Sequence, residues 1–146
     1  MKRIKTFLPV ILIATAMAAT VTSCNKGPKP EETAIGFLNA YLSTDYATAA
    51  SFCTKELSEF FNESVQDFEN LTDSVKSIIK RQTAYFTPQI DSVSKYGKDT
   101  LLVSYTIVKN DPADSIATKG ADQLIKSCLS IVKEDEDWKI AALNRL

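Results

Sequence analysis

Histidine is absent from the 146 residues of this sequence. Its absence excludes the Ser-His and Cys-His nucleophile systems and removes the side chain that most often binds transition metals. The three cysteines, Cys24, Cys53 and Cys128, include no Cys-x-x-Cys pair, which argues against a thiol redox site. We therefore expect no catalytic residue of these kinds, no metal and no cofactor.

Acidic residues are missing before Glu31, whereas Lys2, Arg3 and Lys5 open the chain. An almost wholly apolar run follows over residues 7–21, and it is shorter than the ~20 residues that a helix needs to span a bilayer. A basic start followed by a short apolar run is typical of a secretion signal.

The apolar run ends in Val21-Thr22-Ser23-Cys24. This segment resembles the bacterial lipobox, whose cysteine receives a diacylglycerol before a peptidase cuts in front of it. The resemblance implies a signal peptide over 1–23, a lipidated tether over 24–30 and a membrane anchor on Cys24; an ordinary signal peptide with an incidental cysteine is the alternative. Asn25 is not the aspartate of inner-membrane retention, and no acidic cluster follows. We therefore expect an outer-membrane lipoprotein that faces the periplasm, with surface exposure as the alternative.

The mature chain has a net charge of −4, because three of the 17 basic residues and none of the 18 acidic ones lie in the signal. No basic patch stands out against this acidic balance, so we expect no nucleic-acid partner. The remaining length is enough for one domain with a hydrophobic core.

The first half of the mature chain has the apolar spacing of helices. Helices are predicted from Pro30 to about residue 42, and over about 46–53, 57–68 and 71–86, where Pro88 ends the last one. Asn70 and Asp73 form a cap-like pair before it. We assign the aromatic side chains of these helices to the core in preference to a cavity. The first stripe consists of Ala34, Phe37, Leu38, Tyr41 and Leu42.

The second half changes to the two-residue period of strands, which are predicted over 89–96, 100–109, 123–133 and 138–143. One face of the second strand carries Leu101, Val103, Tyr105 and Ile107. Residues 134–137 form an acidic hairpin turn. This order predicts an α+β domain, in which N-terminal helices pack on a curved antiparallel sheet of about four strands.

Two segments carry a family resemblance: Phe37-Leu38-x-Ala40-Tyr41 with Thr44-Asp45-Tyr46-x-x-Ala49, and Leu129-x-Ile131-Val132-Lys133-Glu134-Asp135-x-x-Trp138-Lys139-Ile140. They are similar to small bacterial lipoproteins of unknown function with a nuclear transport factor 2-like, cystatin-like fold, some of them called lumazine-binding-like. The resemblance covers 31–146 and implies one cone-shaped domain that often encloses a pocket. The acidic turn is longer here than the Asp-Gly turn usual in that family.

Such a pocket makes Tyr41 and Tyr105 candidate lining residues, although the fold alone does not choose the function. We favour a non-catalytic module that binds a small apolar ligand or a protein partner, because neither histidine nor an acid pair is visible. One alternative is a pocket enzyme with tyrosine and carboxylate chemistry. The other is a structural envelope component that forms a homodimer through its sheet.

Two kinds of modification stay open. An oxidising compartment permits a Cys53–Cys128 disulfide, but unpaired cysteines are also often buried. Four Asp–hydroxyl–aliphatic triplets resemble the acceptor motif of a periplasmic O-glycosylation system of some anaerobic Gram-negative bacteria, although such pairs are also common in caps and turns. The candidate acceptors are Ser74, Ser92, Thr100 and Ser115.

The lipid anchor is testable by replacing Cys24 with serine. Acyl chains stabilise membrane binding by ~0.8 kcal/mol per buried methylene, so the wild type should take up labelled fatty acid and fractionate with membranes. We expect the Cys24→Ser protein to lose both properties. Fatty-acid labelling of that variant equal to wild type would contradict the assignment.

Overall fold

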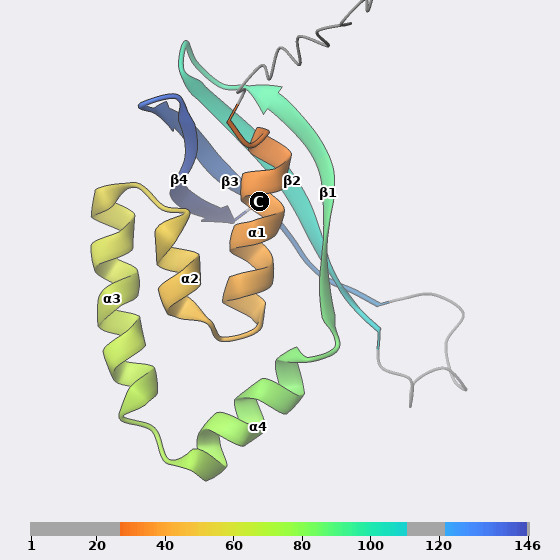
Figure 1. The fold of residues 1–146 in the computed structure, drawn as a ribbon. Helices are drawn as coiled ribbons and strands as arrows, with labels where there is room; N and C mark the ends of the chain where they lie inside the picture. Colours follow the sequence, from red (N-terminus) through yellow and green to blue (C-terminus); the bar gives the residue numbers. More distant parts are fainter. Residues whose placement is uncertain (1–26, 111–121, 146) are drawn as a thin grey trace, which may run out of the picture.

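The structure is a computed structural model that describes residues 27–110 and 122–145. Within these residues, four helices are followed by four strands (Figure 1), which confirms the predicted α+β class. The proposed signal, Cys24 and Ser115 lie outside the described residues. The elements are α1 (Pro30–Leu42), α2 (Tyr46–Ser51), α3 (Lys55–Glu69), α4 (Asp73–Thr83), β1 (Phe86–Lys95), β2 (Thr100–Lys109), β3 (Asp122–Glu134) and β4 (Asp137–Arg145).

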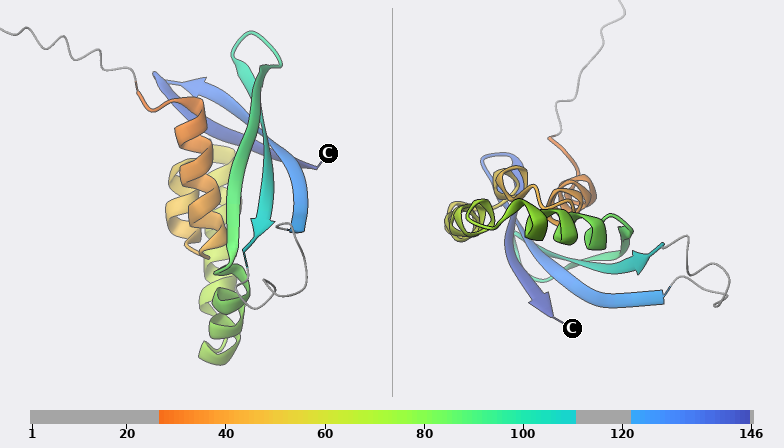
Figure 2. Two further views of the ribbon diagram at one scale, coloured as in Figure 1. Left: turned by 90° about the vertical axis from the view of Figure 1, so that its right-hand side faces the viewer. Right: turned by 90° about the horizontal axis from the view of Figure 1, so that it is seen from below.

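The strands form one antiparallel sheet in the order β1-β2-β3-β4. The register shifts once in each strand pair, including between Ile90 and Ser92 and between Ser130 and Ile131. An extra residue on one strand bends a sheet locally. Figure 2 shows the resulting curved sheet, with the helices on one side of it.

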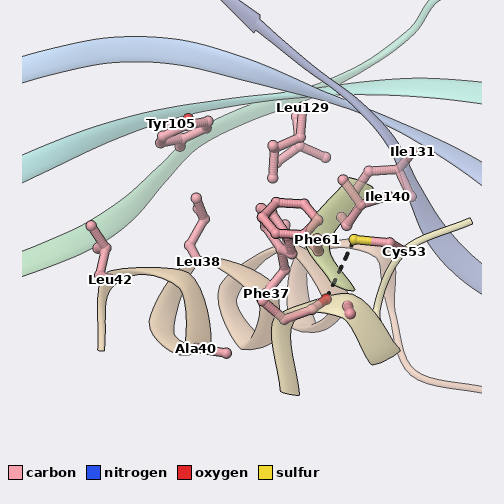
Figure 3. Close-up of a cluster of buried hydrophobic side chains, with 14 of the residues drawn as sticks. Phe37, Leu38, Ala40, Leu42, Cys53, Phe61, Tyr105, Leu129, Ile131 and Ile140 are labelled. Carbon is pink, nitrogen blue, oxygen red and sulfur yellow. Dashed lines mark hydrogen bonds between the residues drawn. The ribbon is translucent and has the colours of Figure 1, made fainter. Parts of the chain in front are cut away.

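The core lies between α1 and the sheet, since α1 packs against all four strands. Phe37 and Leu38 of α1 meet Leu129, Ile131 and Ile140 of the sheet, and all five are almost fully buried (Figure 3). Burying one such side chain stabilises the fold by about 1.5–3 kcal/mol. The predicted apolar faces of α1 and β2 supply seven of the fifteen buried residues of this core.

The segment between α2 and α3 pairs with the edge strand β4. Cys53 forms a parallel bridge with Ile140, because the Thr54 amide donates to the Ile140 carbonyl at 2.8 Å and the Ile140 amide donates to the Phe52 carbonyl at 2.9 Å. The Thr54 hydroxyl then accepts from the Leu57 amide and caps α3. The start of α3 is therefore fixed to the sheet.

The boundaries of α4 differ from the prediction. Thr72 is its cap, accepting from the Val75 amide at 3.5 Å, whereas Asn70 ends α3. The helix stops at Thr83 and β1 begins at Phe86, so the predicted extension to residue 86 is wrong. Pro88 lies within β1, where an edge strand tolerates the missing amide.

The acidic turn is also shorter than predicted. Glu134 and Asp137 pair with each other in the β3–β4 ladder, which leaves only Asp135 and Glu136 in the turn. Both have positive φ angles, 45° and 74°, as a two-residue type I′ hairpin turn requires. The turn therefore has the tight geometry that an Asp-Gly sequence also favours.

Helix α4 extends beyond the lower ends of α1 and α2 in Figure 1. None of its residues is buried, and its apolar Val75 and Ile78 are 39% and 45% exposed. In the part of the chain that the structure describes, no helix has the length and apolar character needed to cross a membrane.

Substitution of one buried and one exposed phenylalanine tests the position of the core. Phe37 is fully buried and Phe60 is 62% exposed. We expect Phe37→Ala to lower the free energy of unfolding by about 3–5 kcal/mol, and Phe60→Ala to change it by less than ~1 kcal/mol. Urea unfolding monitored by circular dichroism measures both, and equal losses would contradict this core.

Candidate functional site

A cleft of about 760 Å³ opens beside α3, between the ends of α1 and β4, and is also lined by Leu71 before α4 and Ile79 within it. We call it the aromatic cleft. Five of its lining residues carry aromatic rings, and α3 supplies more of the lining than any other element. The lining residues are Tyr41, Tyr46, Leu57, Phe60, Phe61, Ser64, Asp67, Phe68, Leu71, Ile79, Ala141, Ala142 and Leu143.

The helical repeat of α3 places these side chains on one face. Leu57, Phe60, Phe61, Ser64 and Phe68 follow the i, i+3, i+4, i+7, i+11 spacing of a single stripe. Of the residues of α3, only Phe61 is buried. The apolar face of this helix is therefore only partly covered by the rest of the described chain.

Edge-on ring contacts join the aromatic wall of the cleft. Phe60 contacts Phe61, Phe61 contacts Tyr41, Tyr41 contacts Tyr46 and Tyr46 contacts Phe68, with ring centroids 5.5–6.0 Å apart. Such pairs contribute about 0.5–1.5 kcal/mol each beyond the area that they bury. The rings therefore hold one another in place.

The wall is continuous with the hydrophobic core. Phe37 lies behind it, with its ring 5.6 Å from Phe61 and 6.0 Å from Tyr41. Because Phe37 is fully buried, the inner wall of the cleft rests directly on the hydrophobic core.

The polar groups of the cleft are two phenols, one hydroxyl and one carboxylate. Burial raises the pKa of Tyr46, and the neighbouring Tyr41 raises it further, so its phenol is protonated at neutral pH. The Ser64 hydroxyl donates to the Phe60 carbonyl at 3.3 Å. Asp67 is exposed, and it is the one lining residue with a charged side chain at neutral pH. The site can thus bind an apolar body and contact a polar group.

The two tyrosines singled out from the sequence take different places. Tyr41 is 38% exposed and lines the aromatic cleft. Tyr105 is only 6% exposed and lies in the core cluster (Figure 3). Burial raises its pKa despite a hydrogen bond with Ser127. It does not line the aromatic cleft, because α1 covers the face of β2 from which it points.

Cys53 and Cys128 are both free and buried. The Cys53 thiol donates to the Ala49 carbonyl at 3.3 Å, and Cys128 pairs with Ser104 and Asn144 in the sheet register. Of the two arrangements that the sequence left open, the structure has separate packed thiols and not a disulfide.

Three of the four candidate glycosylation sites are described. Ser74 is exposed in α4 and Ser92 is exposed in β1, whereas Thr100 is half-buried at the start of β2. Their modification stays a prediction. Over residues 27–110 and 122–145, no group of three or more acidic or cysteine side chains is arranged to hold a metal ion.

The exposure of the outer rings of the site is not predicted by the sequence. The helical spacing of Phe60 and Phe68 on α3 predicts that both rings pack in the core. Phe60 is instead 62% exposed. The periodicity identified the apolar face correctly and carried no information on what covers it.

A second hollow, also about 760 Å³, lies against α4 and the first residue of β1. Its lining includes Ile78, Arg81, Tyr85, Phe86 and Lys109. No pair among these rings makes a ring contact like those of the aromatic cleft, and α4 buries none of its residues. The aromatic cleft is therefore the better-supported binding site in the described chain.

Comparison with protein-family models gives no match, and comparison with curated proteins gives none either. One similar solved structure is a SEC-C motif-containing protein from Rhodopseudomonas palustris, with 12% identity, a TM-score of 0.49, and 80% of this chain and 78% of that chain covered. Another, from Campylobacter jejuni, is described as NTF2-like, with 16% identity, a TM-score of 0.47, and 79% and 99% covered. These likenesses assign no function, and the α+β class follows from the elements themselves.

The Cys53 thiol should resist alkylation in the folded protein. Burial raises its pKa from 9.0 to about 12, and the charge of Lys139 only partly opposes this. The stability that the protonated thiol contributes is complete below pH 9 and is lost as the pH rises toward 12. At pH 9 we expect iodoacetamide to modify Cys53 about a hundredfold more slowly in native than in urea-unfolded protein.

Peptide mass spectrometry distinguishes Cys53 from Cys128 in this experiment. Equal rates for Cys53 in native and unfolded protein would contradict the buried thiol.

Proposed function

We propose that this chain is a lipid-anchored protein of the cell envelope whose domain is a non-catalytic binding module for a small apolar or amphipathic ligand. The proposal rests on the aromatic cleft, whose partly exposed rings are joined by ring contacts to the buried core. Phe60 is 62% and Tyr41 38% exposed there.

Energetic arguments support a ligand in this cleft. Removing apolar surface from water stabilises a complex by roughly 25 cal/mol per Å², and sites for small molecules commonly have volumes of roughly 300–1,000 Å³. The cleft volume of about 760 Å³ falls within this range. Rings that already contact one another lose little freedom when a ligand binds, which lowers the cost of association.

An enzyme that uses tyrosine and carboxylate chemistry is less well supported by the same groups. The raised pKa of Tyr46 makes its phenol a weak acid and leaves little phenolate to act as a base at neutral pH. Asp67 is solvent-exposed, whereas proton-transfer carboxylates are usually tuned by burial. Both groups suit recognition better than catalysis.

The envelope location rests on the lipobox and the tether. Only residues 24–29 separate the proposed lipid from α1, which begins at Pro30. Six extended residues reach about 20 Å. The anchor would therefore keep the start of α1 near the membrane surface, whereas the cleft lies at the other end of this helix, beside Tyr41.

Binding is tested with the neutral fluorophore phenylnaphthylamine and the mature chain carrying Cys24→Ser. We expect saturable binding of one probe per chain, and we expect Phe60→Ala to weaken it about tenfold through the loss of ~1.4 kcal/mol of apolar contact. Tyr96→Ala is the matched control, because Tyr96 is 73% exposed and does not line the cleft.

Equal probe affinity in the Phe60→Ala and wild-type proteins would contradict the proposed site. Absence of saturable binding to the wild type would contradict the proposed function.

A further inference from the structure

We propose that the aromatic cleft is selective for organic cations, with an apolar body against the rings and an ammonium group beside Asp67. This inference rests on the proposed function and names the class of ligand. The observation behind it is a lining that combines five aromatic rings and one carboxylate with neither lysine nor arginine.

The faces of aromatic rings are electron-rich and attract cations. A cation over a phenyl or phenol ring gains about 0.5–1 kcal/mol at an exposed site and about 2 kcal/mol where water is excluded. Tyr41, Tyr46, Phe60 and Phe68 supply such rings from three different helices. A ligand cation in the cleft would therefore lie near rings from all three helices.

One ring of the cleft already interacts with an ammonium group of the protein itself. Lys76 Nζ lies 5.9 Å from the centroid of the Phe68 ring. The same nitrogen donates to the Glu69 carbonyl at 2.8 Å and lies 3.4 Å from the Glu69 carboxylate. This arrangement of ring, carboxylate and ammonium is a local precedent for the one that we infer around Asp67.

The charge of α3 favours the same class of ligand. The helix carries five acidic side chains and one basic side chain: Glu56, Glu59, Glu63, Asp67 and Glu69, with Lys55. Lys76 is paired with Glu69 and does not line the cleft. Helix α4, which contributes Ile79 to the lining, is by contrast basic. It carries Lys76, Lys80 and Arg81 against Asp73, so α3 and α4 together have a net charge of −2. This net negative charge attracts cations and repels anions.

Asp67 is the residue that should distinguish a cation from a neutral ligand. It is one turn beyond Ser64 and one residue before Phe68 on the lining face of α3. Its carboxylate would pair with an ammonium group whose apolar body lies against the aromatic wall. An anionic ligand would place like charges together in this cleft.

Three ligands that share a phenylalkyl body and differ in the charge of the polar group test the inference. They are phenylbutylammonium, phenylbutanol and phenylbutyrate. We expect isothermal titration calorimetry of the mature chain to give about tenfold tighter binding of the ammonium than of the alcohol. Phenylbutyrate should bind most weakly. Raising the salt concentration should reduce the differences, because screening weakens exposed charge pairs.

The matched variants are Asp67→Asn and Glu59→Gln, each of which removes one exposed carboxylate of α3 at nearly constant size. Asp67→Asn should remove most of the preference for the ammonium, measured as the ratio of its affinity to that of phenylbutanol for the same variant. Glu59→Gln should retain the preference, because Glu59 does not line the cleft. Thermal unfolding of both variants checks that the fold is intact.

The possible failures are distinguishable. Equal affinity of the wild type for all three ligands would overturn the charge selectivity and leave the proposed binding function standing. Loss of the preference in Glu59→Gln as well as in Asp67→Asn would overturn the assignment to Asp67. No binding of any of the three would overturn both the inference and the proposed function.

Discussion

The pairing of the α2–α3 connection with β4 is the constraint on which the site depends. Two backbone hydrogen bonds, of 2.8 and 2.9 Å, join this connection to Ile140. Ile140 is itself fully buried in the core, so the bridge is anchored to the hydrophobic core. Because Thr54 in this bridge also caps α3, the same contact sets where that helix begins and where its aromatic face points.

Stability and binding are served by different surfaces of the same rings and helices. The contact of α1 with the sheet buries the large side chains that hold the fold together. The outer rings of α3 add little to that core, since Phe61 alone among its residues is buried. An apolar face that the described chain leaves partly open departs from ordinary core packing, and such departures are expected at functional sites. The neighbouring Asp67 adds a negative charge to that apolar face.

The sequence predicted what local periodicity can determine. The stripe that includes Phe37 and Leu38 and the alternation that includes Val103 were correct, because each face is buried over most of its length. The exceptions are Tyr41, which is 38% exposed, and Leu101, which is half-buried. The boundary near Phe86 was wrong, since its spacing fits either a helix or a strand and only pairing with Lys109 decides between them. The different places of Tyr105 and Phe60 depend on what covers them, and that is a property of the assembled fold.

An NMR titration of the isotopically labelled mature chain with phenylbutylammonium tests whether the aromatic cleft binds organic cations. We expect saturable shift changes that concentrate on five residues and leave the acidic turn at Asp135 unchanged. The five residues are Tyr41, Tyr46, Phe60, Asp67 and Phe68. Shift changes that avoid them, or that spread evenly over the exposed surface, would show that the ligand does not bind in the aromatic cleft.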